Sequence, residues 1–306
     1  MCILRYRILV RVKDAYEALD FEGERNRMKV RKYIVLAAMA LAVMALALVG
    51  CSSGGSASSA SASSSASSAS SAAAGDIALV TPGKLTVATS PDYPPFENLE
   101  NGEYVGLDVE IAKAIAEKLG LELEFKNLQF DAIIPGIAAG GQADMGISGF
   151  SVDPERAKQI DFTDSYYIDD QAIAVMKGGD ITADNADKAL NDEKVIIAVQ
   201  TGTTGEDYVK ENFPNAEIKG FGNSTDAFAA MAAGQANAVC TNKAVVEKML
   251  ADAYSDAEIV HQAATGEEYA IVVSKDNPAL TAAINAALGE LKADGTIDKF
   301  VEQYMS

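Results

Sequence analysis

Arg156 is the residue of this 306-residue chain whose type and position best suit ligand chemistry. It follows a loop rich in small polar residues, Ser148 to Asp153, and a planar guanidinium group can bind a carboxylate through two parallel hydrogen bonds, which a lysine cannot do. The same side chain could instead be a solvated helix charge paired with Asp153 or Glu155. The residues alone leave both interpretations of Arg156 open.

Thr203 and Thr204 form a second candidate site, at the start of a helix predicted from Thr204 to Phe213. The unpaired N–H groups and the dipole at a helix N-terminus favour a bound anion. Helix capping would explain the two threonines equally well. The only histidine, His261, follows the run Glu258 to Val260 outside every predicted loop of the site, so we expect it to be structural.

These residues must be positioned by alternating strands and helices, the pattern of parallel sheets with crossover helices. A first set is predicted as strand 85–88, helix 108–119, strand 121–125, helix 131–139, strand 144–147 and a short helix 154–160. A second set is predicted as strand 195–199, helix 204–213, strand 217–221, helix 225–234 and strand 238–241. Open α/β sheets bind ligands at the carboxyl ends of their strands, so the loops after Ala88, Ile147, Val199 and Thr241 are the expected site.

The two sets of elements also contain similar sequences. Asp131-Ala132 through Gly140-Gly141-Gln142-Ala143-Asp144 is matched by Asp226-Ala227 through Gly234-Gln235-Ala236-Asn237. Extended segments at 170–176 and 269–274 would join two lobes of one design and act as a hinge, and the segment 278–304 is helical with a break at Gly295. We therefore predict an α/β fold of two lobes, each a mixed sheet flanked by helices, with lobe 1 formed by 76–168 plus 270–306 and lobe 2 by 169–269.

The N-terminal region has the layout of an export signal. A basic stretch from Met28 to Lys32 is followed by an apolar run from Tyr33 to Val49, the order of a signal peptide, although an uncleaved membrane anchor of similar length is the alternative. Leu48-Val49-Gly50-Cys51 resembles the lipobox of bacterial lipoproteins, in which the cysteine carries the lipid and becomes the mature N-terminus. We expect 28–50 to be the signal peptide, 51–75 the lipidated Cys51 with a Ser/Ala/Gly tether, and 1–27 a doubtful leader upstream of the start at Met28.

The charge and the cysteine content exclude several classes of binding partner and cofactor. The formal net charge of −19 and the pI near 4.4 repel phosphate backbones, so we expect no nucleic-acid partner. Cys2, Cys51 and Cys240 make no disulfide framework, and no Cys/His/Asp set has metal-ligand spacing. We expect a monomer without a metal or another cofactor.

Several motifs, in order along 84–304, resemble the polar amino-acid-binding proteins of bacterial ABC importers, a family of extracellular solute-binding proteins. The motifs are Tyr93-Pro94-Pro95-Phe96, Gly106-Leu107-Asp108-Val109-Glu110-Ile111, Phe130-Asp131-Ala132-Ile133-Ile134-Pro135, Arg156 with Asp161-Phe162-Thr163, Gln200-Thr201-Gly202-Thr203-Thr204, and Leu291-Lys292-Ala293-Asp294-Gly295-Thr296. The resemblance implies the type II periplasmic-binding-protein fold. It also implies a lipid-anchored protein outside the cytoplasm that captures an amino acid or a related carboxylate and delivers it to an ABC permease.

The resemblance also implies roles for single residues. Arg156 corresponds to an arginine that grips the ligand's α-carboxylate, and Tyr93 and Phe130 correspond to aromatic residues that stack on the ligand side chain. Ser148, Gly149 and Ser151 would line the same pocket, with Thr203 and Thr204 facing them from the second lobe.

Two positions depart from the family pattern. Many relatives have an aspartate, which pairs with the ligand's α-ammonium group, where this chain has Asn242. A neutral hydrogen bond is worth about 1 kcal/mol against about 1.5 to 3 for a charged one, so either another carboxylate substitutes or the ligand is unusual. Ser90 replaces an acidic residue of relatives selective for basic amino acids, which argues against lysine, arginine or ornithine as the preferred ligand.

The alternative hypothesis is an enzyme on the same fold, since relatives include a dehydratase acting on arogenate or prephenate. Such chemistry needs a general acid or base in the cleft. Asp92 and Glu268 leave that option open, but we expect a binding protein without catalytic residues. A sensory module is a third option, although no fused kinase or pore is present in the chain.

Overall fold

The computed structural model describes residues 77–306. The predicted leader, the signal peptide and Cys51 with its tether lie outside these described residues. None of the helices within 77–306 has the length and apolar character needed to cross a membrane.

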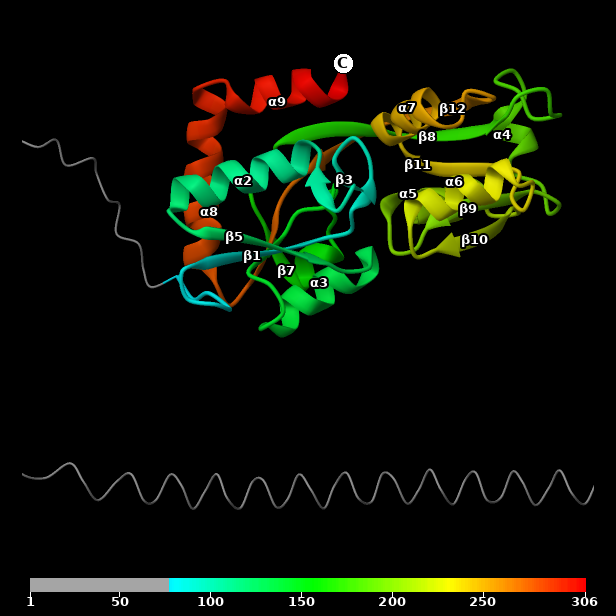
Figure 1. The fold of residues 1–306 in the computed structure, drawn as a ribbon. Coiled ribbons are helices and arrows are strands. Elements are labelled where there is room, and N and C mark those ends of the chain that lie inside the picture. The colour runs from blue at the N-terminus through cyan, green and yellow to red at the C-terminus, as the bar shows by residue number, and fades with distance from the viewer. Residues whose placement is uncertain (1–76) are drawn as a thin grey trace, which may run out of the picture. The chain divides into compact units, whose positions relative to one another are not determined.

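The first sheet has five strands in the order β5-β1-β6-β13-β7. Figure 1 labels β5, β1 and β7 of this sheet. Their bounds are β1 Lys84–Thr89, β5 Glu122–Asn127, β6 Met145–Gly146, β7 Ile160–Phe162 and β13 Val272–Ser274. Strand β1 pairs in parallel with β5 and β6, whereas β13 is antiparallel to β6 and β7.

Helices cover both faces of this sheet, because successive side chains of a strand point to opposite sides. On one side Val87 packs in a cluster with Ile111 of α2 (Leu107–Leu119) and Leu288 of α8 (Pro278–Ala293). On the other side Ala88 packs with Ile133 of α3 (Phe130–Ala139). The last helix, α9 (Thr296–Met305), contacts α2 and α8, so the C-terminal segment packs beside the first sheet.

The second sheet repeats the plan of the first, in the order β10-β9-β11-β8-β12. Its strands are β8 Tyr167–Met176, β9 Ile196–Gln200, β10 Glu217–Phe221, β11 Ala238–Asn242 and β12 Ala257–Tyr269. Its helices are α4 Ala186–Ala189, α5 Thr204–Asn212, α6 Ser224–Ala232 and α7 Lys243–Asp252. Strand β9 is parallel to β10 and β11, and β8 is antiparallel to β11 and β12, so both sheets share one strand order and one pattern of direction. The predicted two-lobed α/β fold is confirmed.

The chain passes between the sheets twice. It leaves β7 for β8 through residues 163–166 and returns from β12 to β13 through residues 270–271. The extended segment predicted at 269–274 includes the second connection, whereas the one predicted at 170–176 lies wholly within β8, beyond the first connection. Strand β8 begins three residues earlier, and most of the second segment lies beyond β12.

Five features were not predicted: helices α4 and α7, strand β7, the full length of β12, and a small sheet of β2 Asp92–Tyr93, β3 Glu97–Glu100 and β4 Glu103–Val105. The predicted helix at 154–160 is a single 3-10 turn, η1 Arg156–Lys158, followed by β7. Asp153 bonds to the backbone N–H groups of Glu155 and Arg156, which ties this turn to the preceding loop.

Candidate functional site

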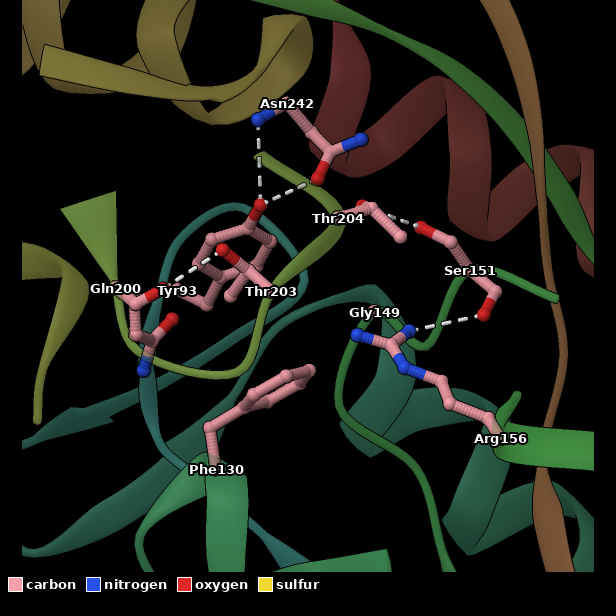
Figure 2. A pocket seen from close by; sticks show the side chains of 9 residues that line it. All are labelled: Tyr93, Phe130, Gly149, Ser151, Arg156, Gln200, Thr203, Thr204 and Asn242. Carbon is pink, nitrogen blue, oxygen red and sulfur yellow. Dashed lines mark hydrogen bonds between the residues drawn. The ribbon is translucent and has the colours of Figure 1, made fainter. Parts of the chain in front are cut away.

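A pocket lies between residues of the two sheets (Figure 2). The residues that line it are Tyr93, Phe130, Gly149, Ser151, Arg156, Gln200, Thr203, Thr204 and Asn242.

The topology explains why these residues meet. Gly149 and Ser151 follow β6, Gln200 ends β9, and Asn242 ends β11. These strands run parallel to β1 or to each other within their sheets, so their carboxyl ends lie on one edge, the expected binding edge of open α/β sheets.

Arg156 is the only arginine within residues 77–306. Its Nη1 donates to the Ser151 carbonyl at 2.9 Å and its Nη2 to the Gly202 carbonyl at 3.0 Å. No ion pair with Asp153 or Glu155 holds it, since Asp153 bonds to backbone N–H groups and Glu155 pairs with Lys158. Burial lowers the pKa of Arg156, although the charges of Asp153 and Glu267 act against that effect.

Phe130 supports the guanidinium group of Arg156, whose Cζ lies 5.5 Å from the centroid of the ring. The same ring stacks on Phe150 at 4.8 Å and belongs to the cluster around Ile133. Phe130 is therefore both a core residue and a wall of the pocket.

Thr203 caps helix α5, and this accounts for its hydroxyl group. Its Oγ1 accepts from the Glu206 N–H at 3.2 Å and donates to the Gln200 carbonyl at 2.7 Å. Thr204 instead points its hydroxyl into the pocket wall, where Oγ1 lies 3.3 Å from Ser151 Oγ. The backbone N–H groups at the start of α5 that Thr203 does not cap have no partner within the helix, so they can donate to a ligand.

Asn242 is held by Tyr93 across the two sheets. The Tyr93 hydroxyl donates to Asn242 Oδ1 at 2.7 Å, accepts from the Asn242 backbone N–H at 3.3 Å and lies 2.7 Å from Thr241 Oγ1. Burial raises the pKa of Tyr93. This tyrosine is thus a link between the lobes as well as a lining residue.

Ser148 does not line the pocket, contrary to expectation. Its hydroxyl donates to Glu97 Oε1 at 2.6 Å and accepts from the Ser90 backbone N–H at 3.1 Å, on the inner side of the loop. The neighbouring Gly149, at a φ of +55°, turns the chain toward the pocket. Ser90 likewise faces inward, since its hydroxyl donates to Asp92 at 2.7 Å.

Gln200 was missed as a lining residue. It is the last residue of β9, so the rule that ligands bind at the carboxyl ends of strands would have found it. Its Nε2 donates to the Gly222 carbonyl at 3.1 Å and lies 3.4 Å from Asp92 Oδ2.

The described residues contain no group of three or more histidine, cysteine or acidic side chains that could hold a metal ion. His261 lies apart from the pocket, where Nε2 contacts the Tyr208 hydroxyl at 2.7 Å and Nδ1 contacts Asp187 at 2.9 Å.

Two similar sheets, two connections and a small polar pocket between them define a solute-binding protein. Residues 85–306 match the model of the bacterial extracellular solute-binding proteins, family 3, and the chain belongs to this family.

Curated relatives have transport roles. The chain is 32% identical over 228 residues to ABC transporter arginine-binding protein 1 of Escherichia coli, covering 72% of this chain and 90% of that protein. It is also 32% identical over 213 residues to the ABC transporter glutamine-binding protein GlnH of Bacillus subtilis, covering 68% and 76%.

Among solved structures, an ancestral amino acid-binding protein described as a precursor of cyclohexadienyl dehydratase matches with a TM-score of 0.68 and 36% identity. That match covers 73% of this chain and 96% of the ancestral one. An ancestral arginine-binding protein bound to glutamine matches with a TM-score of 0.67 and 38% identity, covering 73% and 98%.

Proposed function

We propose that this protein captures an amino acid, or a closely related small carboxylate, between its two lobes and delivers it to an ABC importer. The observation that carries the proposal is the Arg156 guanidinium group. It lines the pocket, is fixed by two backbone carbonyls and Phe130, and forms no ion pair within residues 77–306. A guanidinium has five N–H donors, so others remain for a ligand carboxylate.

Binding of free amino acids tests this proposal. We expect at least one of the twenty L-amino acids to bind in equilibrium dialysis and to raise the melting temperature of the protein, because a ligand of the folded state stabilises it. The Arg156→Lys variant keeps the positive charge but loses the planar fork, and it should bind that amino acid about tenfold or more weakly. The absence of binding to every amino acid would overturn the proposal.

Release to a permease requires that the lobes open and close. We propose that the ligand binds first to the lobe carrying Arg156 and that rotation about 163–166 and 270–271 brings up the lobe carrying Thr204. Closure is driven by contacts that form only when both lobes touch the ligand. Small-angle scattering should show compaction when the identified amino acid saturates the protein, and unchanged dimensions would contradict this step.

The place of action is proposed to be outside the cytoplasm, with the protein anchored through lipid on Cys51. The family is described as extracellular, and the signal-peptide pattern from Met28 to Cys51 supports export. Cells expressing the wild-type chain should incorporate labelled palmitate into it, and the Cys51→Ala variant should not. Equal labelling of the two proteins would refute the anchor.

We propose that the chain does not catalyse a reaction. Neither of the two acidic residues considered as a catalytic acid or base lines the pocket. Asp92 bonds to the backbone N–H of Ser224, and Glu268 is exposed on β12. The similar ancestral protein is itself described as amino acid-binding. Consumption of prephenate or arogenate by the purified protein would contradict this assignment.

A further inference from the structure

Glu267 brings a carboxylate to the pocket from strand β12, away from the loops at the ends of the parallel strands. Its Oε2 accepts hydrogen bonds from the Ser151 hydroxyl, from the Thr204 hydroxyl at 2.7 Å and from Asn242 Nδ2 at 3.3 Å. All three donors line the pocket. Glu267 therefore forms the wall directly behind them.

An irregularity of β12 aims this side chain. The register against β8 shifts between Ala263 and Glu267, and Gly266 has a φ of +59° and donates its N–H to Asp170 Oδ1 at 3.0 Å. Irregularities of this kind redirect the side chains that follow them. The second carboxylate oxygen of Glu267 is fixed by Gln171 Nε2 at 2.8 Å.

The pocket is thus lined by the cation Arg156, and the anion Glu267 lies directly behind three of its lining residues; neither charge forms an ion pair in the described part of the chain. Within residues 77–306 no ion pair includes Arg156 or Glu267, because the guanidinium donates to backbone carbonyls and the carboxylate accepts from neutral groups. Ser151 lies between them, with its carbonyl bonded to Arg156 and its hydroxyl to Glu267. Partly buried charges are stabilised by an opposite charge, and a zwitterion whose charges are close together supplies both.

The orientation of Asn242 shows which group can accept from an ammonium. Asn242 Oδ1 already accepts from the Tyr93 hydroxyl, and its Nδ2 is turned toward Glu267 as a donor. An ammonium group carries three donors and no acceptor. The anionic acceptor at this end of the pocket is therefore the carboxylate of Glu267.

We propose that Glu267 is the residue that binds the α-ammonium group of the ligand, in the role that the amide of Asn242 does not fill. This inference rests on the proposed function, since it names the partner of one end of the amino acid. Arg156 and Glu267 then define a site selective for α-amino acids over simple carboxylic acids.

The test compares ligands with and without the amino group by equilibrium dialysis on the full chain in detergent. The probes are L-glutamine and L-arginine, each beside its counterpart lacking the α-amino group, glutaramic acid and 5-guanidinovaleric acid, within a panel of the twenty L-amino acids. Glu267→Gln should weaken binding of the amino acid about ten- to hundredfold, the range of a charge-assisted hydrogen bond. Binding of the deaminated counterpart should be weak in the wild-type chain and not weaker in the variant.

The matched control is Glu268→Gln, which removes the adjacent exposed carboxylate of the same strand and should bind like the wild-type chain. The double variant Glu267→Gln with Asn242→Asp should recover about tenfold or more of the lost affinity, because it returns a carboxylate to the same end of the pocket. Recovery also separates ligand contact from loss of folding, since a misfolded chain would not regain affinity.

The possible negative results distinguish the role of Glu267 from the proposed function. Wild-type affinity for the amino acid in Glu267→Gln would overturn this inference and leave the proposed function standing. An equal loss for 5-guanidinovaleric acid and L-arginine would also overturn it, because the carboxylate would then act on the side chain or on the fold. A wild-type chain that binds none of the twenty amino acids would overturn the proposed function and this inference together.

Discussion

Two carboxyl groups buried behind the pocket should make the stability of this protein fall as pH rises. Glu97 and Asp108 are both 0% exposed. Glu97 accepts from Ser148, and Asp108 Oδ2 accepts from the Gly149 N–H at 2.8 Å, so the pair holds the loop that reaches the pocket. Burial raises the pKa of Asp108 from 3.8 to about 6, and burial together with the charge of Asp108 raises the pKa of Glu97.

The direction of this change in stability with pH follows from proton binding. A carboxyl group whose pKa is higher in the folded state binds its proton more tightly there, so its contribution to stability is full below the unfolded pKa and falls as pH rises through the folded pKa. For Asp108 the window runs from 3.8 to about 6. About two pKa units at 1.36 kcal/mol each correspond to a loss of about 3 kcal/mol across that window.

The Asp108→Asn variant removes this titration. Its amide oxygen can still accept from the Gly149 N–H, and its amide nitrogen can donate to Glu97. The loss of an acidic residue in the first turn of α2 costs about 0.3 to 1 kcal/mol at all pH values above the window. From about pH 4 to about pH 7, the wild-type protein should therefore lose up to about 3 kcal/mol more free energy of unfolding than the variant.

Urea unfolding followed by circular dichroism at several pH values measures the difference. The matched control is Asp298→Asn, which removes an exposed carboxylate from the first turn of α9 and should keep the wild-type slope. Parallel curves for the wild-type protein and Asp108→Asn would refute the reasoning, since they would mean that Asp108 titrates alike in the folded and unfolded chain.

Three further changes have definite expected outcomes. Gly106→Ala should destabilise the fold by about 3 kcal/mol or more in urea unfolding, because Gly106 has a φ of +129° and a Cβ there would lie 2.1 Å from the Phe96 carbonyl oxygen. Gly289→Ala should instead raise stability by up to about 1 kcal/mol in the same assay, since this position of α8 has open space around it; a loss would contradict the helix assignment. Asp92→Ala should favour the open form, because it removes the carboxylate that accepts from the Ser224 N–H at the start of α6 in the other lobe. Small-angle scattering that shows no expansion of the ligand-free variant would contradict this role of Asp92.

The sequence predicted most of the elements that position the pocket. Helices α2 and α3 were predicted because apolar residues recur at helical spacing and glycines follow their ends, with Gly120 and Gly140 at the C-caps. The similarity between residues 131–144 and 226–237 correctly indicated that the two lobes share one fold. The same strand order in both sheets is its structural basis.

The sequence was less informative where an element has few neighbours. Strand β12 pairs only with β8, at the edge of the second sheet, and its register is interrupted twice. Exposed residues and a glycine therefore break the alternation that marks a strand. Helix α7 is different, because its buried residues Val245, Val246 and Met249 recur at helical spacing and the sequence does indicate this helix.

Gln200 is a lining residue that the strand rule points to but that was not predicted, and Ser148 is a predicted residue that local geometry turns away from the pocket. Eight of the nine predicted ligand-binding residues line the pocket, and Ser148 does not because Gly149 turns the loop after it. No pattern in the sequence distinguishes the inner hydroxyl of Ser148 from the outer hydroxyl of Ser151. That distinction depends on which polar groups are buried behind the loop, here Glu97 and Ser90.

The acidic residue proposed to bind the ligand's ammonium group could not be identified from the sequence either. The sequence revealed that position 242 lacks a carboxylate, but it offered two adjacent acids, Glu267 and Glu268, and neighbouring residues of a strand face opposite sides. Which of them faces the pocket depends on the register of β12, which places Glu267 opposite Asp169 and Glu268 opposite Ile168. A shift of one residue would exchange the two side chains. The bulge fixed by Gly266 and Asp170, rather than the presence of an acid in the sequence, therefore decides which carboxylate reaches Ser151, Thr204 and Asn242.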